Sequence, residues 1–240
     1  MPERPTSLAA PMSNQVRTTA QHWSLSTRRL YLCTADRPDL EQFLAGCISG
    51  GVDIVQLRDK ELDDRALVER ARLARSVCSD HGVPFILNDR PDLAAESGAD
   101  GVHVGQDDMS AVSTRLVVGT DALVGLSSHA APELDTAIGG PDAPPAPVDY
   151  ISAGPVSATP TKPGRPGTGL GYVREAVARS PWPVWITGGV APDTVDAMLE
   201  AGARHFVVVR WLTEAADAAA HAHALRRAID EGIGRCGARS

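Results

Sequence analysis

Short runs of apolar, β-branched residues alternate along this chain with longer segments in which alanine and leucine recur at helical spacing. Each run has the length and composition of a buried strand, and each longer segment has those of a surface helix. The predicted strands cover residues 29–34, 53–57, 84–88, 101–104, 123–127, 150–154, 184–187 and 205–209. The predicted helices cover residues 38–50, 63–81, 91–98, 109–117, 131–138, 170–179, 192–201 and 214–231.

This alternation predicts an α/β protein with a parallel sheet, because parallel strands need a crossover between them. Eight such units favour a single closed (β/α)8 TIM barrel, since the alternative, an open doubly wound sheet, usually has fewer strands. We expect the barrel to cover residues 29–232, after a flexible leader at 1–28 and before a flexible tail at 233–240. Two Pro-rich stretches, 141–147 and 160–166, predict surface loops on either side of the sixth strand.

Composition narrows the class of protein. The 240 residues carry a formal net charge of −7 without a basic tract, which argues against a nucleic-acid partner. No apolar run approaches the ~20 residues of a membrane-spanning helix, so we expect no membrane partner. The four cysteines form neither a CxxC pair nor a zinc-ligand spacing, which favours reduced thiols in a cytoplasmic protein. A small anionic substrate is compatible with this charge, because a few local cations suffice to bind it.

Cationic side chains follow the second predicted strand, at the end where barrels of this type have their active sites. Gln56, Arg58 and Lys60 alternate along extended chain, so their side chains point the same way. An arginine fork and a lysine point charge together suit a phosphate or diphosphate. The alternative is that Arg58 and Lys60 pair with the adjacent carboxylates of Asp59 or Glu61.

Carboxylates follow the third and fourth predicted strands. Asp89 and Asp108 close neighbouring strands, so both can lie within reach of one ion. Two carboxylates completed by substrate phosphate oxygens are a usual environment of Mg²⁺. The alternative is that Asp107 or Asp108 caps the helix predicted at 109–117.

A glycine pair follows the seventh strand, and Val209-Arg210 follows the eighth. Loops at these two places recur as a phosphate site in TIM barrels, where exposed backbone N–H groups bind the anion. Gly188-Gly189 and Val209-Arg210 therefore predict a second phosphate site, apart from the first. The alternative is a plain turn into the next helix.

The histidines suggest no catalytic base. His103 lies between two valines in the fourth strand, which favours a packed interior side chain. His221 and His223 are two residues apart on a predicted helix, so they lie on different faces, and we expect both to be exposed. No serine stands in a GxSxG elbow.

Taken together, these motifs resemble the thiamine-phosphate synthase family, also called thiamine-phosphate pyrophosphorylase, over roughly residues 29–230. They are Gln-x-Arg-x-Lys (Gln56, Arg58, Lys60), Asn-Asp (Asn88, Asp89), His-x-Gly-Gln-x-Asp (His103, Gly105, Gln106, Asp108) and Thr-x-Thr-Lys (Thr159, Thr161, Lys162). The family joins a hydroxymethylpyrimidine diphosphate to a thiazole phosphate and releases pyrophosphate.

The resemblance implies a role for each matching position. The residues implied to hold the pyrimidine diphosphate are Gln56, Arg58, Lys60, Asn88, Ser127 and Lys162, with Leu57 and Asp59 of the same stretch counted among the substrate-binding residues. Asp89 and Asp108 would bind Mg²⁺. Thr159 and Thr161, with the backbone at Gly189, Val209 and Arg210, would seat the thiazole phosphate. Arg58, Lys60 and Lys162 are the implied catalytic residues.

The implied chemistry explains why no base is evident. The nucleophile is an aromatic thiazole nitrogen without a proton to lose, so the reaction needs charge stabilisation of the leaving diphosphate and positioning of two substrates. A thiazole tautomerase on the same barrel, or a thiazole-phosphate binding protein without catalysis, are the alternatives. A homo-oligomer is left open.

Overall fold

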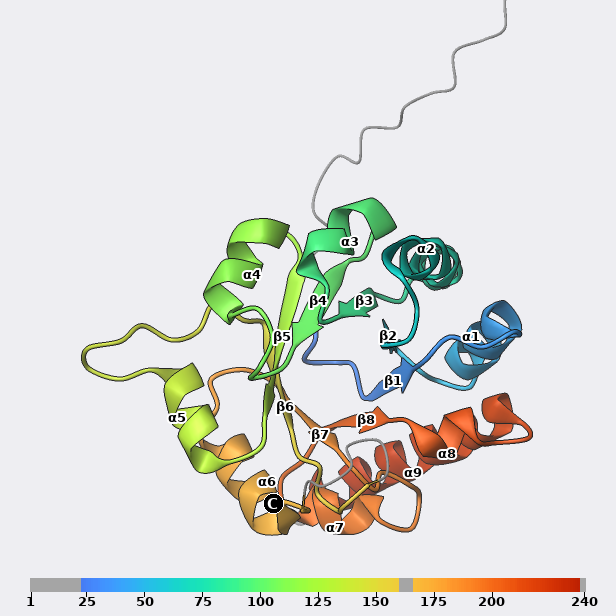
Figure 1. Cartoon of the computed structure of the whole chain (residues 1–240). Coiled ribbons are helices and arrows are strands. Elements are labelled where there is room, and N and C mark those ends of the chain that lie inside the picture. The colour runs from blue at the N-terminus through green and yellow to red at the C-terminus, as the bar shows by residue number, and fades with distance from the viewer. Residues whose placement is uncertain (1–22, 160–165, 238–240) are drawn as a thin grey trace, which may run out of the picture.

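Eight parallel strands close into a barrel in chain order, with helices outside it, in this computed structural model (Figure 1). The structure describes residues 23–159 and 166–237. The predicted (β/α)8 TIM barrel is confirmed. Within the described ranges, no helix combines the length and the apolar composition needed to cross a bilayer.

The strands are β1 (Leu30–Thr34), β2 (Ile54–Leu57), β3 (Phe85–Asn88), β4 (Gly101–Val104), β5 (Leu123–Ser128), β6 (Tyr150–Ala153), β7 (Val184–Thr187) and β8 (His205–Val208). The helices are α1 (Leu40–Ser49), α2 (Asp64–Asp80), α3 (Pro91–Ser97), α4 (Ala111–Val118), α5 (Ala131–Ile138), α6 (Gly169–Arg179), α7 (Val195–Glu200), α8 (Arg210–Thr213) and α9 (Ala218–Gly237). Each predicted strand is present, with ends that differ by at most one residue.

Two apolar layers hold the barrel together. Side chains that point outward from the strands, such as Leu32 and Val55, pack under the helices. Side chains that point inward form a second cluster, which includes Tyr31, Ile86 and the fully buried Trp185. Because successive strand residues face opposite sides, every strand except β4 contributes apolar side chains to both layers.

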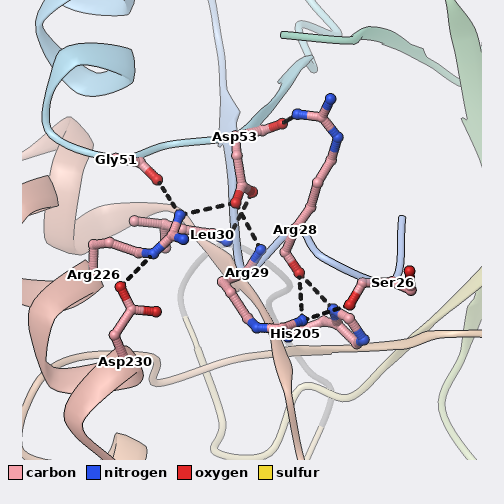
Figure 2. Close-up of polar contacts among 9 residues, drawn as sticks. All are labelled: Ser26, Arg28, Arg29, Leu30, Gly51, Asp53, His205, Arg226 and Asp230. Carbon is pink, nitrogen blue, oxygen red and sulfur yellow. Dashed lines mark hydrogen bonds and ion pairs between the residues drawn. The ribbon is translucent and has the colours of Figure 1, made fainter. Parts of the chain in front are cut away.

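A cluster of polar contacts closes the amino-terminal end of the barrel (Figure 2). The Asp53 carboxylate, at the start of β2, accepts the backbone N–H groups of Arg29 and Leu30 at 2.8 and 3.0 Å. It also accepts the Arg226 guanidinium of α9 at 2.9 Å. On β8, His205 Nδ1 donates to the Arg28 carbonyl oxygen at 2.7 Å. This cluster ties β1, β2, β8 and α9 together at the end opposite to the site, where a stabilising role is expected.

The described chain extends past both predicted barrel limits. Before β1, Leu25 is buried in the inner apolar cluster, and the Arg28 guanidinium lies 5.0 Å from the centre of the Trp23 ring. At the other end, α9 continues to Gly237. Residues 1–22 of the predicted leader and 238–240 of the predicted tail lie outside the described residues.

Candidate active site at the carboxyl ends of the strands

The Lys60 ammonium faces the next strand rather than its own neighbours. Its Nζ lies 3.2 Å from Oδ2 of Asp89. The carboxylate of Asp59 instead accepts backbone N–H groups of the same loop, from Glu61 at 2.9 Å and Leu62 at 3.1 Å. These bonds hold the loop after β2 in shape, and they lower the pKa of the Asp59 carboxyl below its usual value against the opposing effect of burial. The local pairing considered from the sequence is therefore not the one formed by Lys60.

The side chain of Arg58 is available to a substrate at this end of the barrel, whereas that of Leu57 is not. Arg58 is half-buried, and its guanidinium forms no ion pair within the described ranges. The Leu57 side chain points away from the barrel interior and is buried in the outer apolar layer. Arg58 can therefore offer its side chain to a substrate, whereas Leu57 can offer only its backbone.

Asp89 and Asp108 form a close carboxyl pair, as the sequence indicated. Asp89 is held in the left-handed region at φ 60°, and its backbone N–H donates to the His103 carbonyl at 2.8 Å. Burial first, and then the hydrogen bond and charge of Asp108, raise the pKa of the Asp89 carboxyl, although Lys60 opposes this. Asp108 is placed by the Gly105 N–H, which donates to its Oδ2 at 2.7 Å.

The alternative role for the aspartates, capping α4, belongs to another residue. Ser110 occupies the N-cap position, and its Oγ accepts the Ser113 N–H at 3.1 Å. Asp108 is therefore not required by the helix, and its carboxylate remains next to Asp89.

The carboxyl pair fits a divalent cation that keeps some of its water. The described residues contain no group of three or more His, Cys, Asp or Glu side chains that could enclose a metal ion. Because Asp108 disfavours the charged form of Asp89, a cation between the two carboxylates would stabilise that form. Mg²⁺ accepts such a small protein ligand set when substrate phosphates supply further oxygens.

Three buried polar side chains line the interior between these groups. Gln56, Asn88 and Ser127 come from the carboxyl ends of β2, β3 and β5, and each is less than a tenth exposed. All three point into the barrel, because they lie two or four residues along their strands from Ile54, Ile86 and Leu123 of the inner cluster. Polar groups at this depth can orient a substrate by hydrogen bonds.

A cavity of about 460 Å³ opens beside β6, β7 and β8. Its lining contains the predicted residues Thr159, Gly189, Val209 and Arg210, together with Pro155, Ala158, Thr187, Gly188, Val190, Ala191, Val207, Trp211, Glu214, Ala215 and His221. Gly188 and Gly189 both have positive φ, 91° and 76°. A Cβ on Gly188 would lie 2.5 Å from Cβ of Pro155, so only glycine fits this close approach.

Part of this cavity was not predicted. The His221 ring stacks on Trp211 with 4.7 Å between ring centres, and its Nδ1 donates to the Trp211 carbonyl oxygen at 3.1 Å. His221 is therefore partly buried, and the expectation that it is exposed was wrong, whereas His223 is exposed. The missed signal is the short helix α8, which brings Trp211 back toward α9 and is too short to show a period.

Two predicted residues, Thr161 and Lys162, lie outside the described residues. The sequence contains two lysines in all, Lys60 and Lys162, and both were assigned to this site.

Comparison with known proteins agrees with this arrangement. A profile described as thiamine monophosphate synthase (TMP-TENI) matches residues 30–212. A thiamine-phosphate synthase of Thermobifida fusca is 46% identical over 209 residues, which cover 85% of this chain and 94% of the relative. A thiamine-phosphate synthase of Thermus thermophilus is 43% identical and covers 84% and 97% of the two chains.

A solved structure has the same architecture. The thiamine phosphate pyrophosphorylase of Pyrococcus furiosus superposes with a TM-score of 0.76 at 25% identity, covering 86% of this chain and 97% of that one. The chain therefore belongs to the thiamine-phosphate synthase family, and it is a transferase of thiamine biosynthesis.

Proposed function

We propose that the enzyme joins 4-amino-2-methyl-5-hydroxymethylpyrimidine diphosphate to 4-methyl-5-(2-phosphoethyl)thiazole, giving thiamine phosphate and pyrophosphate. The observation that carries this proposal is the division of one barrel end into two unlike halves. Cations and paired carboxylates lie at β2–β4, and a glycine-lined cavity lies at β6–β8. Two phosphorylated substrates can thus be held side by side.

The first half binds the pyrimidine diphosphate. Lys60 and Arg58 supply positive charge to the diphosphate, and Lys162, which follows β6 in the sequence, would add a third cation. Gln56, Asn88 and Ser127 supply hydrogen bonds from the interior. Leu57 contributes only backbone, and Asp59 acts through the shape of its loop.

Asp89 and Asp108 hold Mg²⁺ in this proposal. Their facing carboxylates support it, because burial and mutual repulsion raise the pKa of Asp89. The ion would neutralise negative charge on the leaving diphosphate. Lys60, which lies against Asp89, then contacts both the carboxylate and the diphosphate.

The second half seats the thiazole phosphate. Thr159 and Thr161 offer hydroxyl groups, and the backbone at Gly189, Val209 and Arg210 offers N–H donors. The Arg210 guanidinium is paired with Glu214 at 2.7 Å, which leaves the backbone of Arg210 as its contribution. A phosphate bound by backbone amides is a recurrent arrangement at this position of TIM barrels.

The reaction is a dissociative displacement. The C–O bond between the pyrimidine methylene and the diphosphate breaks, and its electron pair leaves with the diphosphate. The lone pair of the thiazole nitrogen then forms the new C–N bond, so no proton is transferred. The protein's contribution is charge stabilisation by Arg58, Lys60 and Lys162, with alignment of both substrates.

The direct test mixes the protein with both substrates and Mg²⁺ and detects thiamine phosphate as fluorescent thiochrome, with an EDTA control. We expect product that EDTA abolishes. We also expect Lys162→Ala to lose the most turnover of any single substitution, about a hundredfold or more. Parental turnover in Lys162→Ala would contradict its catalytic role, and no product with both substrates bound would favour the tautomerase or binding-protein alternatives.

The lysine content offers a second, independent readout. Reductive methylation with ¹³C-formaldehyde labels only Lys60, Lys162 and the amino terminus. We expect inorganic pyrophosphate with Mg²⁺ to shift both lysine signals, because both cations would contact it. Signals that stay in place would contradict a diphosphate site at these residues.

We further propose that two copies associate through the α4 patch, defined as Met109, Val112, Leu116 and Val117. These are exposed apolar side chains, and Leu116 is 80% exposed. Arg115, the one charged residue of α4, turns inward to Asp149 at 2.6 Å. The four side chains therefore form an uncharged apolar surface on a molecule of net charge −7, which a second copy could bury.

Sedimentation equilibrium tests this pairing. We expect a dimer for the parent chain and a monomer for Leu116→Lys, while Arg227→Glu on the exposed face of α9 leaves the mass unchanged. A monomeric parent chain would overturn the proposal.

We also propose a cytoplasmic location. Cys47 and Cys78 are free and buried, as is usual where thiols stay reduced. Cell fractionation would contradict this if the protein were found in an oxidising compartment.

A further inference from the structure

A chain of hydrogen bonds crosses the barrel interior from β2 to β5. Gln56 Nε2 donates to the Tyr31 hydroxyl at 2.9 Å, and this hydroxyl lies 3.0 Å from that of Tyr150. The Tyr150 hydroxyl lies 3.3 Å from His103 Nδ1. On the other side of the ring, His103 Nε2 lies 3.0 Å from Ser127 Oγ. All five side chains are buried.

The amide of Gln56 gives this chain a direction. Its nitrogen can only donate, and its Oε1 accepts the Cys33 thiol at 3.0 Å. The Tyr31 hydroxyl therefore accepts a hydrogen bond from Gln56 and donates one to the Tyr150 hydroxyl. The Tyr150 hydroxyl in turn donates a hydrogen bond to His103 Nδ1. Burial raises the pKa of both phenols, so each keeps the proton that it donates.

The histidine is then restricted to one tautomer. Because Nδ1 accepts from Tyr150, the ring proton resides on Nε2, which donates to Ser127 Oγ. Among the described residues, His103 is the only hydrogen-bond partner of the Ser127 hydroxyl. The proton of Ser127 is consequently directed away from His103.

The packing around Tyr150 is specific to this arrangement. A Cβ on Gly125 would lie 2.1 Å from Cζ of Tyr150 and 2.5 Å from Nδ1 of His103. The absence of a side chain at this β5 position leaves the space in which the phenol and the imidazole meet. The two rings stack with 5.6 Å between centres. The chain of hydrogen bonds is thus built into the inner layer of the barrel.

We propose that Tyr150 and His103 are positioning residues, which orient the Ser127 hydroxyl so that it donates a hydrogen bond to the leaving diphosphate. This rests on the proposed contact between Ser127 and the diphosphate. The Ser127 hydroxyl accepts a hydrogen bond from His103 and donates one to the substrate. It therefore cannot rotate its proton away from the substrate without losing the hydrogen bond to the diphosphate.

The tautomer is tested without substrate, in ¹⁵N-histidine-labelled protein in alkaline buffer. The His103 signals are assigned as those that disappear in His103→Asn, since the sequence has seven histidines. We expect a protonated Nε2 and a bare Nδ1 in the parent, and a mixture of tautomers in Tyr150→Phe. A protonated Nδ1 in the parent would reverse every bond of the chain and overturn the proposal.

A double-mutant cycle tests the connection to catalysis. We expect Tyr150→Phe to lower kcat about tenfold with an unchanged KM for the thiazole phosphate, since a donor is misdirected rather than removed. In a Ser127→Ala background the same substitution should have no further effect on kcat. Full additivity of the two losses would overturn the proposal, because Tyr150 would then act independently of Ser127.

Ile86→Val is the matched control for the inner layer. It removes one methyl group from a fully buried neighbour outside the hydrogen-bonded chain. It should leave both kcat and the His103 tautomer unchanged. Suppose that Ser127→Ala keeps the activity of the parent while His103 shows the expected tautomer. The proposed contact between Ser127 and the diphosphate would then be wrong, whereas the hydrogen-bonded chain that fixes the tautomer would stand.

Discussion

At the scale of single residues, the facing carboxylates of Asp89 and Asp108 make a prediction about the metal. Asp108→Asn removes one of two anionic oxygen ligands and the neighbour that raises the pKa of Asp89. We expect the Mg²⁺ concentration for half-maximal activity to rise about tenfold or more, while activity at saturating Mg²⁺ partly recovers. Metal titrations of turnover measure this. The exposed variant Asp121→Asn should titrate like the parent, and an unchanged midpoint in Asp108→Asn would contradict the assignment.

The same pair shows how far residue-level prediction reaches. The type and spacing of Asp89 and Asp108 were enough to predict their proximity, because the ends of adjacent parallel strands meet. The partner of Lys60 was not predictable in the same way. Asp59 is adjacent in the sequence, but its carboxylate is occupied by backbone N–H groups of its loop, so the lysine pairs with Asp89 on the next strand.

At the scale of elements, the contact between the loops after β6 and β7 makes a prediction about substrate affinity. Gly188→Ala would place a methyl group 2.5 Å from Cβ of Pro155 at a φ of 91°. We expect the KM for the thiazole phosphate to rise about tenfold, because the strain displaces the backbone that lines the cavity. Steady-state kinetics at fixed pyrimidine diphosphate measure this.

Gly119→Ala separates strain from displacement. Gly119 also has a positive φ, 79°, but no atom lies within 4 Å of its missing Cβ, and it follows α4 and does not line the cavity. The substitution should cost backbone strain alone and leave the KM unchanged. An equal rise in KM for both variants would refute the local explanation.

Elements differ in how well the sequence predicts them. The strands are buried on both faces, so their apolar runs are continuous and their ends were found within one residue. The predicted helix 214–231 corresponds to α9, which begins at Ala218 and ends at Gly237. The short helix α8 lies before the predicted range and was missed, because a four-residue helix has no period to detect. The stacking of His221 on Trp211 depends on that short helix, and it could not be foreseen from residue spacing.

At the scale of the whole molecule, closure of the barrel depends on the polar cluster around Asp53 (Figure 2). Asp53→Asn removes the ion pair with Arg226 and leaves one of two backbone N–H groups without its acceptor. We expect the free energy of unfolding to fall by about 3 kcal/mol in chemical denaturation. Arg235→Ala, which breaks an exposed pair with Asp196, should change it by less than ~1 kcal/mol. Equal losses would show that Asp53 contributes no more than a surface ion pair.

His205 in the same cluster gives the stability of the molecule a pH dependence. Burial lowers the pKa of His205 below its usual value of 6.5, although its bond to the Arg28 carbonyl opposes the shift. On acidification the unfolded chain therefore takes up this proton before the folded chain does. Folding stability should fall as pH decreases below about 6.5, until the folded-state pKa is reached. The contribution of Asp53 to the pH dependence of stability has the opposite sign, because burial raises the pKa of its carboxyl. Asp53 titrates, however, at more acidic pH than His205.

Urea unfolding between about pH 8 and pH 5.5 isolates the effect of His205 from that of Asp53. His205→Asn keeps an N–H group that can donate to the Arg28 carbonyl but cannot be protonated in this range. We expect its stability to depend less on pH than that of the parent, whereas His223→Asn, at an exposed position on α9, should retain the parental slope. Because the cluster lies at the end of the barrel opposite to the active site, kcat at pH 8 should be the same in all three proteins. A parental slope in His205→Asn would assign the acid sensitivity of the fold to other groups.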